Sequence, residues 1–124
     1  MNVADIAWVG LAGSLGAAAR FLLDGAVRAR VATSLPVGTV TINLTGSLLL
    51  GLLTGLVVWH AAPGTLTLVA GTGFCGGYTT FSTASFESVR LVQQGRRRAA
   101  AATLSVSVLG ALAAAAAGLA LGSL

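Results

Sequence analysis

The chain has 124 residues, of which 56% are hydrophobic and only 8% are charged. A soluble domain usually carries about 25% charged residues, so this chain has too few charges to cover a surface that faces water. Its mean hydropathy of +0.92 favours a lipid bilayer instead. We therefore expect an all-α integral membrane protein with a single domain over residues 1–124, surrounded by membrane lipid, and no enzyme.

The net charge of +4 comes from seven arginines and three acidic residues. In a soluble protein this excess would suggest nucleic acid. Here the arginines stand in short segments between apolar stretches, where they report orientation in the membrane, and we expect no nucleic-acid partner. The single cysteine, Cys75, excludes an internal disulfide and a multi-cysteine metal site, and its apolar neighbours predict a buried packing residue.

Four apolar stretches are long enough to cross the hydrocarbon layer, which takes about 20 helical residues. The predicted membrane spans are residues 6–23, 37–59, 66–85 and 99–124. Trp59 supplies an interfacial anchor, and Pro63 and Gly64 a turn between the second and third spans. No basic segment precedes the first span, so we expect it to remain in the mature protein rather than to act as a signal peptide.

The second span carries small and polar residues at every fourth position, which places them on one helical face. They are Thr39, Asn43, Ser47, Gly51 and Gly55. The two glycines form a GxxxG pattern that favours close helix packing. The Asn43 amide is costly in a bilayer unless it is bonded, and its two N–H donors can serve either a neighbouring helix or a permeating anion.

Polar residues of the first and fourth spans have less specific interpretations. Arg20 stays charged at any ordinary pH, and its place near the end of its span favours snorkelling to the interface over a direct role in attracting anions. Asp24, one turn later, is a possible ion-pair partner. Thr103 and Ser107 share a face of the fourth span, where they either line a polar path or bond back to backbone carbonyls.

The third span has the least ordinary sequence, from Gly71 to Thr83. Glycine costs about 1 kcal/mol per helical position, and threonine loses rotamer freedom in a helix. The glycines at 73, 76 and 77, followed by a run of hydroxyl residues, therefore predict a break in this helix. Backbone groups freed by such a break must be satisfied by protein, water or a bound ion, and transporters use these breaks as ion sites.

Three stretches of the chain, in the right order, resemble the small bacterial fluoride channels of the Fluc or CrcB family. The resemblance covers nearly the whole chain, and the third stretch is highly specific. Arg20, Gly77 and Thr80 fall within these stretches, and we assign structural roles to them. The three stretches are residues 13–21, residues 36–47, and residues 73–83 with Glu87 following.

The resemblance implies an antiparallel dimer of four-helix subunits, with two anion pores and a structural sodium ion on the dimer axis. It implies that the backbone carbonyls of Gly76 and Thr79 bind the sodium, that Asn43 donates to fluoride, and that Phe81 turns its ring toward the anion. It also implies passive export of fluoride from the cytoplasm. Further candidates for a polar track along the pore are Ser82, Thr83, Thr103 and Ser107.

The chemistry of fluoride is consistent with these residue types. A selective pore must replace the water of a small, tightly hydrated anion with converging donors, without a fixed cation that would hold the anion too strongly. Neutral amides, hydroxyls and the positive edges of aromatic rings suit this task. The chain departs from the family at Ala84, where a second phenylalanine normally follows three residues after the first, so at least one pore lacks a ring.

Two other classes of protein have similar size and hydropathy. A small four-span multidrug exporter exchanges cations for protons and needs a titratable carboxylate within a span, whereas Asp5, Asp24 and Glu87 all stand near span ends. A membrane assembly subunit without transport activity would need only the glycine-rich faces. Neither class predicts the run from Gly76 to Thr83.

Charge placement predicts the orientation. With four spans, six arginines lie in two loops on one side, and the termini and the His60 loop lie on the other. The positive-inside rule places both arginine loops on the cytoplasmic side of a bacterial plasma membrane and both termini on the outer side. A fixed orientation and Ala84 together favour a heterodimer with a related chain of opposite orientation, although a homodimer stays open. The six residues are Arg28, Arg30, Arg90, Arg96, Arg97 and Arg98.

Overall fold

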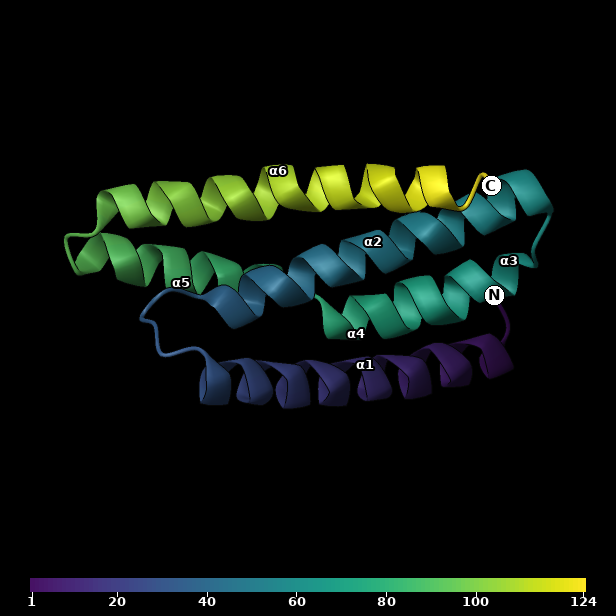
Figure 1. Ribbon diagram of the computed structural model, residues 1–124. Coiled ribbons are helices and arrows are strands. Elements are labelled where there is room, and N and C mark those ends of the chain that lie inside the picture. The colour runs from purple at the N-terminus through teal and green to yellow at the C-terminus, as the bar shows by residue number, and fades with distance from the viewer.

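The computed structural model describes residues 1–124 as a helical protein without strands (Figure 1). Three helices are long and apolar enough to cross a membrane, namely α1, α2 and α6, whereas the third predicted span is divided among shorter helices. The all-α membrane fold with a broken third span is thereby confirmed. In chain order the elements are α1 (Val3–Arg30), α2 (Val37–His60), α3 (Gly64–Leu66), the π-helix η1 (Thr67–Cys75), α4 (Gly76–Tyr78), α5 (Phe81–Gln93) and α6 (Arg97–Leu121).

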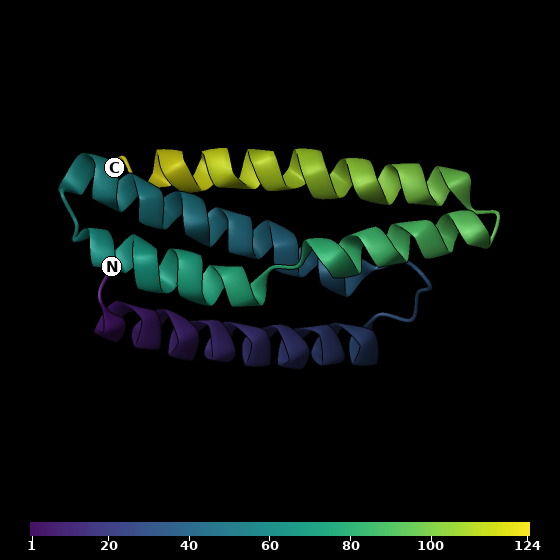
Figure 2. The same cartoon turned by 180° about the vertical axis from the view of Figure 1, so that it is seen from behind.

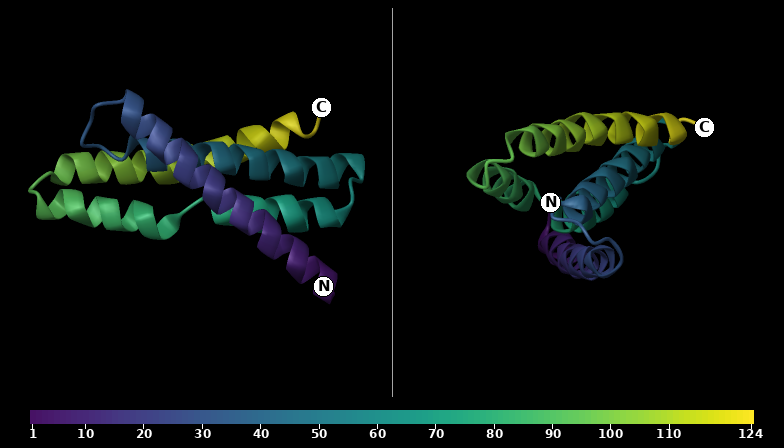
Figure 3. Two further views of the ribbon diagram at one scale, coloured as in Figure 1. Left: turned by 90° about the horizontal axis from the view of Figure 1, so that it is seen from below. Right: turned by 60° about the vertical axis from the view of Figure 1, so that its left-hand side comes forward.

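The helices run roughly along one direction, so the molecule has two ends. Both termini lie at the same end as α3, and the α1–α2 and α5–α6 connections lie at the opposite end (Figure 1). Helix α6 runs beside α2 and α5, while α1 crosses η1 and α4 obliquely (Figure 3). The arginine-bearing connections therefore share one end of the molecule.

Helix α1 begins with a capping box and extends beyond the apolar stretch. The Asn2 side chain accepts from the backbone N–H of Asp5 at 2.9 Å, and the Asp5 carboxylate accepts from the backbone N–H of Asn2 at 2.9 Å. The helix continues to Arg30, past the predicted span end at residue 23. A charge ends a stretch of high hydropathy but does not end a helix, and Arg28 and Arg30 interact favourably with the helix C-terminus.

Glycines allow α2 and α6 to approach through their backbones. A side-chain carbon at Gly51 would overlap the carbonyl oxygen of Ala115, and one at Gly118 would overlap that of Leu48. Gly55 lies against Gly122 in the same interface. The packing interpretation of the GxxxG pattern is therefore confirmed.

A similar approach joins α1 to the third span. A side-chain carbon at Gly16 would overlap the Phe74 carbonyl oxygen, and one at Gly77 would overlap that of Gly13. Gly77 thus allows the backbones of α4 and α1 to approach each other. Cys75, on the same segment, is buried as predicted.

Most of the apolar surface is uncovered within the single chain. Only 17 of the 124 residues are buried, and Ile42 is the one large side chain that is fully buried. Exposed apolar side chains cover both α1 and α6, for example Leu15 and Leu109. Lipid or a further protein chain must cover this surface, because exposing so much apolar surface to water is unfavourable.

Candidate functional site

The third span is interrupted between α4 and α5. Thr79 and Thr80 are extended, with φ/ψ values of −80°/159° and −148°/121°, and they form the link between the two helices (Figure 2). The Thr80 hydroxyl caps α5 by accepting from the Thr83 amide at 3.1 Å. The predicted helix break is therefore present at these two residues.

The Asn43 side chain of α2 binds the backbone at this break. Its Nδ2 donates to the Thr80 carbonyl at 2.9 Å, and its Oδ1 accepts from the Thr80 amide at 2.8 Å. Both backbone groups of Thr80 are thus satisfied by one side chain. Because Nδ2 carries two hydrogens and makes one hydrogen bond within the chain, one amide hydrogen of Asn43 remains free.

The break also deprives several carbonyl oxygens of their helical partners, among them those of Gly76 and Thr79. In an α-helix the Thr80 amide would donate to Gly76 and the Thr83 amide would donate to Thr79. These amides donate instead to the Asn43 side chain and to the Thr80 hydroxyl. The carbonyls of Gly76 and Thr79 are thus free of their helical hydrogen bonds, and these are the two that the family resemblance assigns to ion binding.

A second polar contact joins α2 to α5 toward the arginine-bearing end. The Thr39 hydroxyl donates to Glu87 Oε1 at 3.1 Å. Thr39 lies one turn before Asn43 on α2, and Glu87 lies about two turns after Thr80. Between the two contacts, the Thr83 hydroxyl accepts from the Thr80 hydroxyl at 3.1 Å. We call this series of side chains, residues 39, 43, 80, 83 and 87, the polar ladder.

An open groove of about 690 Å³ lies beside the break, and its walls come from α2, η1, α4, α5 and α6. Phe81, whose side chain would turn to an anion, is 86% exposed, and Ala84 lines the groove near it. Six of the predicted site residues line this groove, namely Asn43, Gly76, Thr79, Thr80, Phe81 and Ser107.

The other predicted residues do not line the groove. Ser82 is exposed, with its hydroxyl 3.4 Å from that of Thr80. Thr103 is half-buried on α6. Arg20 is half-buried on α1 and makes no ion pair. Asp24 pairs with Arg28 at 2.9 Å instead, so the Arg20–Asp24 pair considered from the sequence is wrong.

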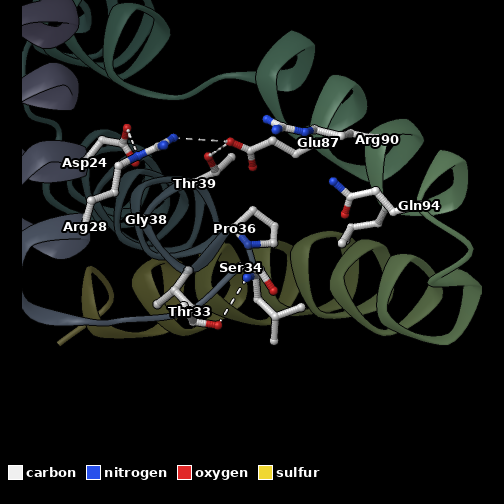
Figure 4. A pocket seen from close by; sticks show the side chains of 13 residues that line it. Asp24, Arg28, Thr33, Ser34, Pro36, Gly38, Thr39, Glu87, Arg90 and Gln94 are labelled. Atoms are coloured by element: carbon white, nitrogen blue, oxygen red, sulfur yellow. Dashed lines mark hydrogen bonds and ion pairs between the residues drawn. The ribbon is translucent and has the colours of Figure 1, made fainter.

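A polar pocket of about 280 Å³ lies at the arginine-bearing end of the molecule (Figure 4). Arg28 there reaches from Asp24 toward Glu87, with its Nη2 3.8 Å from Glu87 Oε1. The other carboxylate oxygen of Glu87, Oε2, is buried and accepts no hydrogen bond. Arg90 and the α1–α2 loop complete the pocket wall.

Comparison with known proteins identifies the family. A family model described as CrcB-like protein, Camphor Resistance (CrcB), matches residues 7–119. The fluoride-specific ion channel FluC 1 of Leifsonia xyli subsp. xyli is 53% identical over 116 residues, which cover 94% of this chain and 85% of that protein. This chain belongs to the CrcB family.

Two further relatives in the CrcB family have similar coverage. The fluoride-specific ion channel FluC 2 of Cutibacterium acnes is 51% identical over 118 residues, which cover 94% of this chain and 95% of that protein. The FluC 2 channel of Mycobacterium tuberculosis is 47% identical over 110 residues, which cover 87% of this chain and 84% of that protein. The resemblance found in the sequence is therefore confirmed along most of the chain.

Sequence reasoning missed two contacts that shape the site of this CrcB-family chain. The Tyr78 hydroxyl lies 2.8 Å from that of Thr45 and ties α4 to α2 just before the break. Glu87 enters the polar ladder although it stands near a span end. The seven-residue spacing from Thr80 places both on one helical face and was the available signal.

We predict that Asn43→Ala lowers the stability of the folded protein in detergent. Removing the amide leaves the buried Thr80 N–H and C=O without partners, at a cost of about 1–3 kcal/mol for each group. Thermal unfolding measures this loss. Ser47→Ala is the matched control, because Ser47 lies one turn further along the same face of α2 and its hydroxyl makes no hydrogen bond. Equal unfolding temperatures for the two variants would contradict a stabilising role for Asn43.

Proposed function

We propose that this protein is a fluoride-selective channel that lowers cytoplasmic fluoride by passive export of the anion. The observation that carries the proposal is the identity of 53% and 51%, over 94% of the chain, with proteins named fluoride-specific ion channels. The apolar helices and the polar groove at the helix break support the same function.

The groups around the groove suit a small anion. The free amide hydrogen of Asn43 and the hydroxyl of Ser107 are neutral donors, and the exposed Phe81 ring has a positive edge. Ser82, Thr83 and Thr103 would extend this set along the path of the ion. No arginine lines the groove, so no fixed positive charge within it would retain fluoride.

Passive conduction is sufficient for export. Hydrofluoric acid is a weak acid that enters cells uncharged and dissociates inside, and the membrane potential then drives the anion outward. This proposal requires neither a nucleotide nor a covalent intermediate.

We predict that liposomes containing the protein release fluoride when a potassium ionophore removes the opposing voltage. Chloride release should stay at the level of protein-free vesicles, because chloride is larger than the anion that the neutral donors are proposed to fit. Fluoride-selective and chloride-selective electrodes measure the two fluxes. Equal release of both anions by the assembled protein would contradict fluoride selectivity.

We further propose that a sodium ion binds the carbonyl oxygens of Gly76 and Thr79 and stabilises a dimer. These oxygens are hard, uncharged ligands that suit such a cation, and both lack their helical hydrogen bonds. Gly76 and Thr79 also line the open groove, where a second chain would contribute the same pair. The ion would be structural and would take no part in conduction.

We predict that replacing sodium with a large organic cation weakens the dimer and reduces fluoride release together, because unsatisfied carbonyls are costly in a membrane. Size-exclusion chromatography and the electrode assay measure the two effects. Restoring sodium to the same sample is the control. Unchanged dimer stability and transport after exhaustive replacement would contradict the sodium site.

The dimer partner is proposed to be a related chain of opposite orientation. Six of the seven arginines lie in segments at one end of the molecule, which favours one fixed orientation with that end in the cytoplasm and both termini outside. Ala84 lines the groove where a second ring is absent. In a heterodimer of this chain, the partner could supply the missing phenylalanine to one of the two pores.

We predict that this chain, expressed alone with a C-terminal tag, inserts in one orientation and conducts poorly. Protease access from each side of the membrane reports the orientation of the tag, and the electrode assay reports conduction. Tags found equally on both sides, together with robust fluoride release from the lone chain, would contradict the heterodimer.

A further inference from the structure

Three charged side chains form a continuous cluster in the polar pocket at the arginine-bearing end. Arg28 Nε lies 2.9 Å from Asp24 Oδ2, and Arg28 Nη2 lies 3.8 Å from Glu87 Oε1 (Figure 4). Both acids therefore share one guanidinium. The Glu87 side chain is mostly buried, with 17% exposed, whereas that of Arg28 is 68% exposed, so the cluster extends from the protein interior to its surface.

The polar ladder connects this pocket with the groove. Thr39 and Glu87 line the pocket, while Asn43 and Thr80, the next members of the ladder, line the groove. Hydrogen bonds join the members across α2 and α5 at both levels. An ion that follows the ladder from the groove toward this end must pass the carboxylate of Glu87.

A carboxylate on the path of an anion needs charge compensation. Glu87 Oε2 accepts no hydrogen bond, so the Thr39 hydroxyl and Arg28 are the groups that offset its charge at short range. Arg90 also lines the pocket and attracts Glu87 at longer range, but it makes no ion pair with that residue. Without Arg28, the two carboxylates of Asp24 and Glu87 would repel an approaching anion.

Because Arg28 is shared by Asp24 and Glu87, it can bind an incoming anion only weakly. A free guanidinium at the mouth would bind small anions and hold them. A guanidinium engaged by two carboxylates has little remaining charge to offer, so it lets an anion enter without retaining it. With Arg28 in place, the cluster therefore repels an anion less than the two carboxylates alone would, and it does not hold the anion tightly.

We infer that Arg28 is a positioning residue that offsets part of the negative charge of Glu87 and Asp24 at one mouth of the conduction path and so lowers the barrier for anions that enter the polar ladder. This inference rests on the proposed fluoride channel function and adds a determinant of conduction at its mouth. It assigns to Asp24 the part of holding Arg28 in place.

The test compares Arg28→Gln with Arg30→Gln in the full protein, with its partner chain if one is required. Both variants lose one positive charge from the last turn of α1, but Arg30 makes no ion pair. We expect R28Q to release fluoride about tenfold more slowly than R30Q at low ionic strength. The difference should shrink at high ionic strength, because salt screens the uncompensated carboxylates.

The double variant R28Q/E87Q separates electrostatics from folding. It removes one of the two carboxylates and so restores the net charge of the cluster, while glutamine still accepts from Thr39, so its fluoride release should recover toward that of R30Q. Size-exclusion chromatography checks that all variants assemble alike. If R28Q conducts as R30Q does, or if the double variant stays as slow as R28Q, the inference is wrong.

Fluoride release by the unaltered protein distinguishes a failure of this inference from a failure of the proposed channel function. Normal fluoride release from it, with equal rates for R28Q and R30Q, contradicts the role of Arg28 and leaves the channel function intact. No fluoride release from the unaltered, assembled protein contradicts the channel function, and the inference about Arg28 with it.

Discussion

A helix that stops inside a bilayer leaves backbone N–H and C=O groups with no water to bind, and in this protein one asparagine side chain resolves that problem. Asn43 satisfies both backbone groups of Thr80. Because it takes the Thr80 amide, it also frees the Gly76 carbonyl from the helix. The same pair of hydrogen bonds therefore stabilises the break and creates the unsatisfied oxygens that make an ion site chemically reasonable there.

A small residue brings α2 close to the break. Gly46 of α2 lies against Tyr78 and Thr79, at a position where a side-chain carbon would overlap the methyl group of Thr79. Tyr78 is tied to Thr45, two residues beyond Asn43 on α2. These contacts hold the extended link against α2 beside Asn43. The open groove lies beside that link.

The sequence allowed much of this site to be predicted. Periodicity placed Thr39 and Asn43 on one face of α2, and the crowding of glycine and threonine predicted a break that the structure has at Thr79 and Thr80. Composition could not tell which of the freed groups would be satisfied, since that depends on contacts between helices. It also gave no sign of the nine-residue π-helix η1 before the break.

The charged residues were harder to place from sequence alone. Asp24 has arginines one turn away on both sides, and the better orientation, with the acid before the base, favours Arg28 over Arg20. The structure has the pair with Arg28 and adds the contact of Arg28 with Glu87, which spacing along one helix could not show. The position of Glu87 near a span end gave it no predicted role in the site. Because α5 is a short helix that follows the break, Glu87 nevertheless faces the interior between α2 and α5.

The central claim is that the Thr80 amide donates to the Asn43 side chain and that this bond organises the break. Hydrogen–deuterium exchange resolved to the Thr80 amide, in the unaltered protein and in Asn43→Ala, measures that bond directly. The account predicts slow exchange in the unaltered protein and much faster exchange in the variant. Fast exchange in both, or equal protection in both, would contradict it.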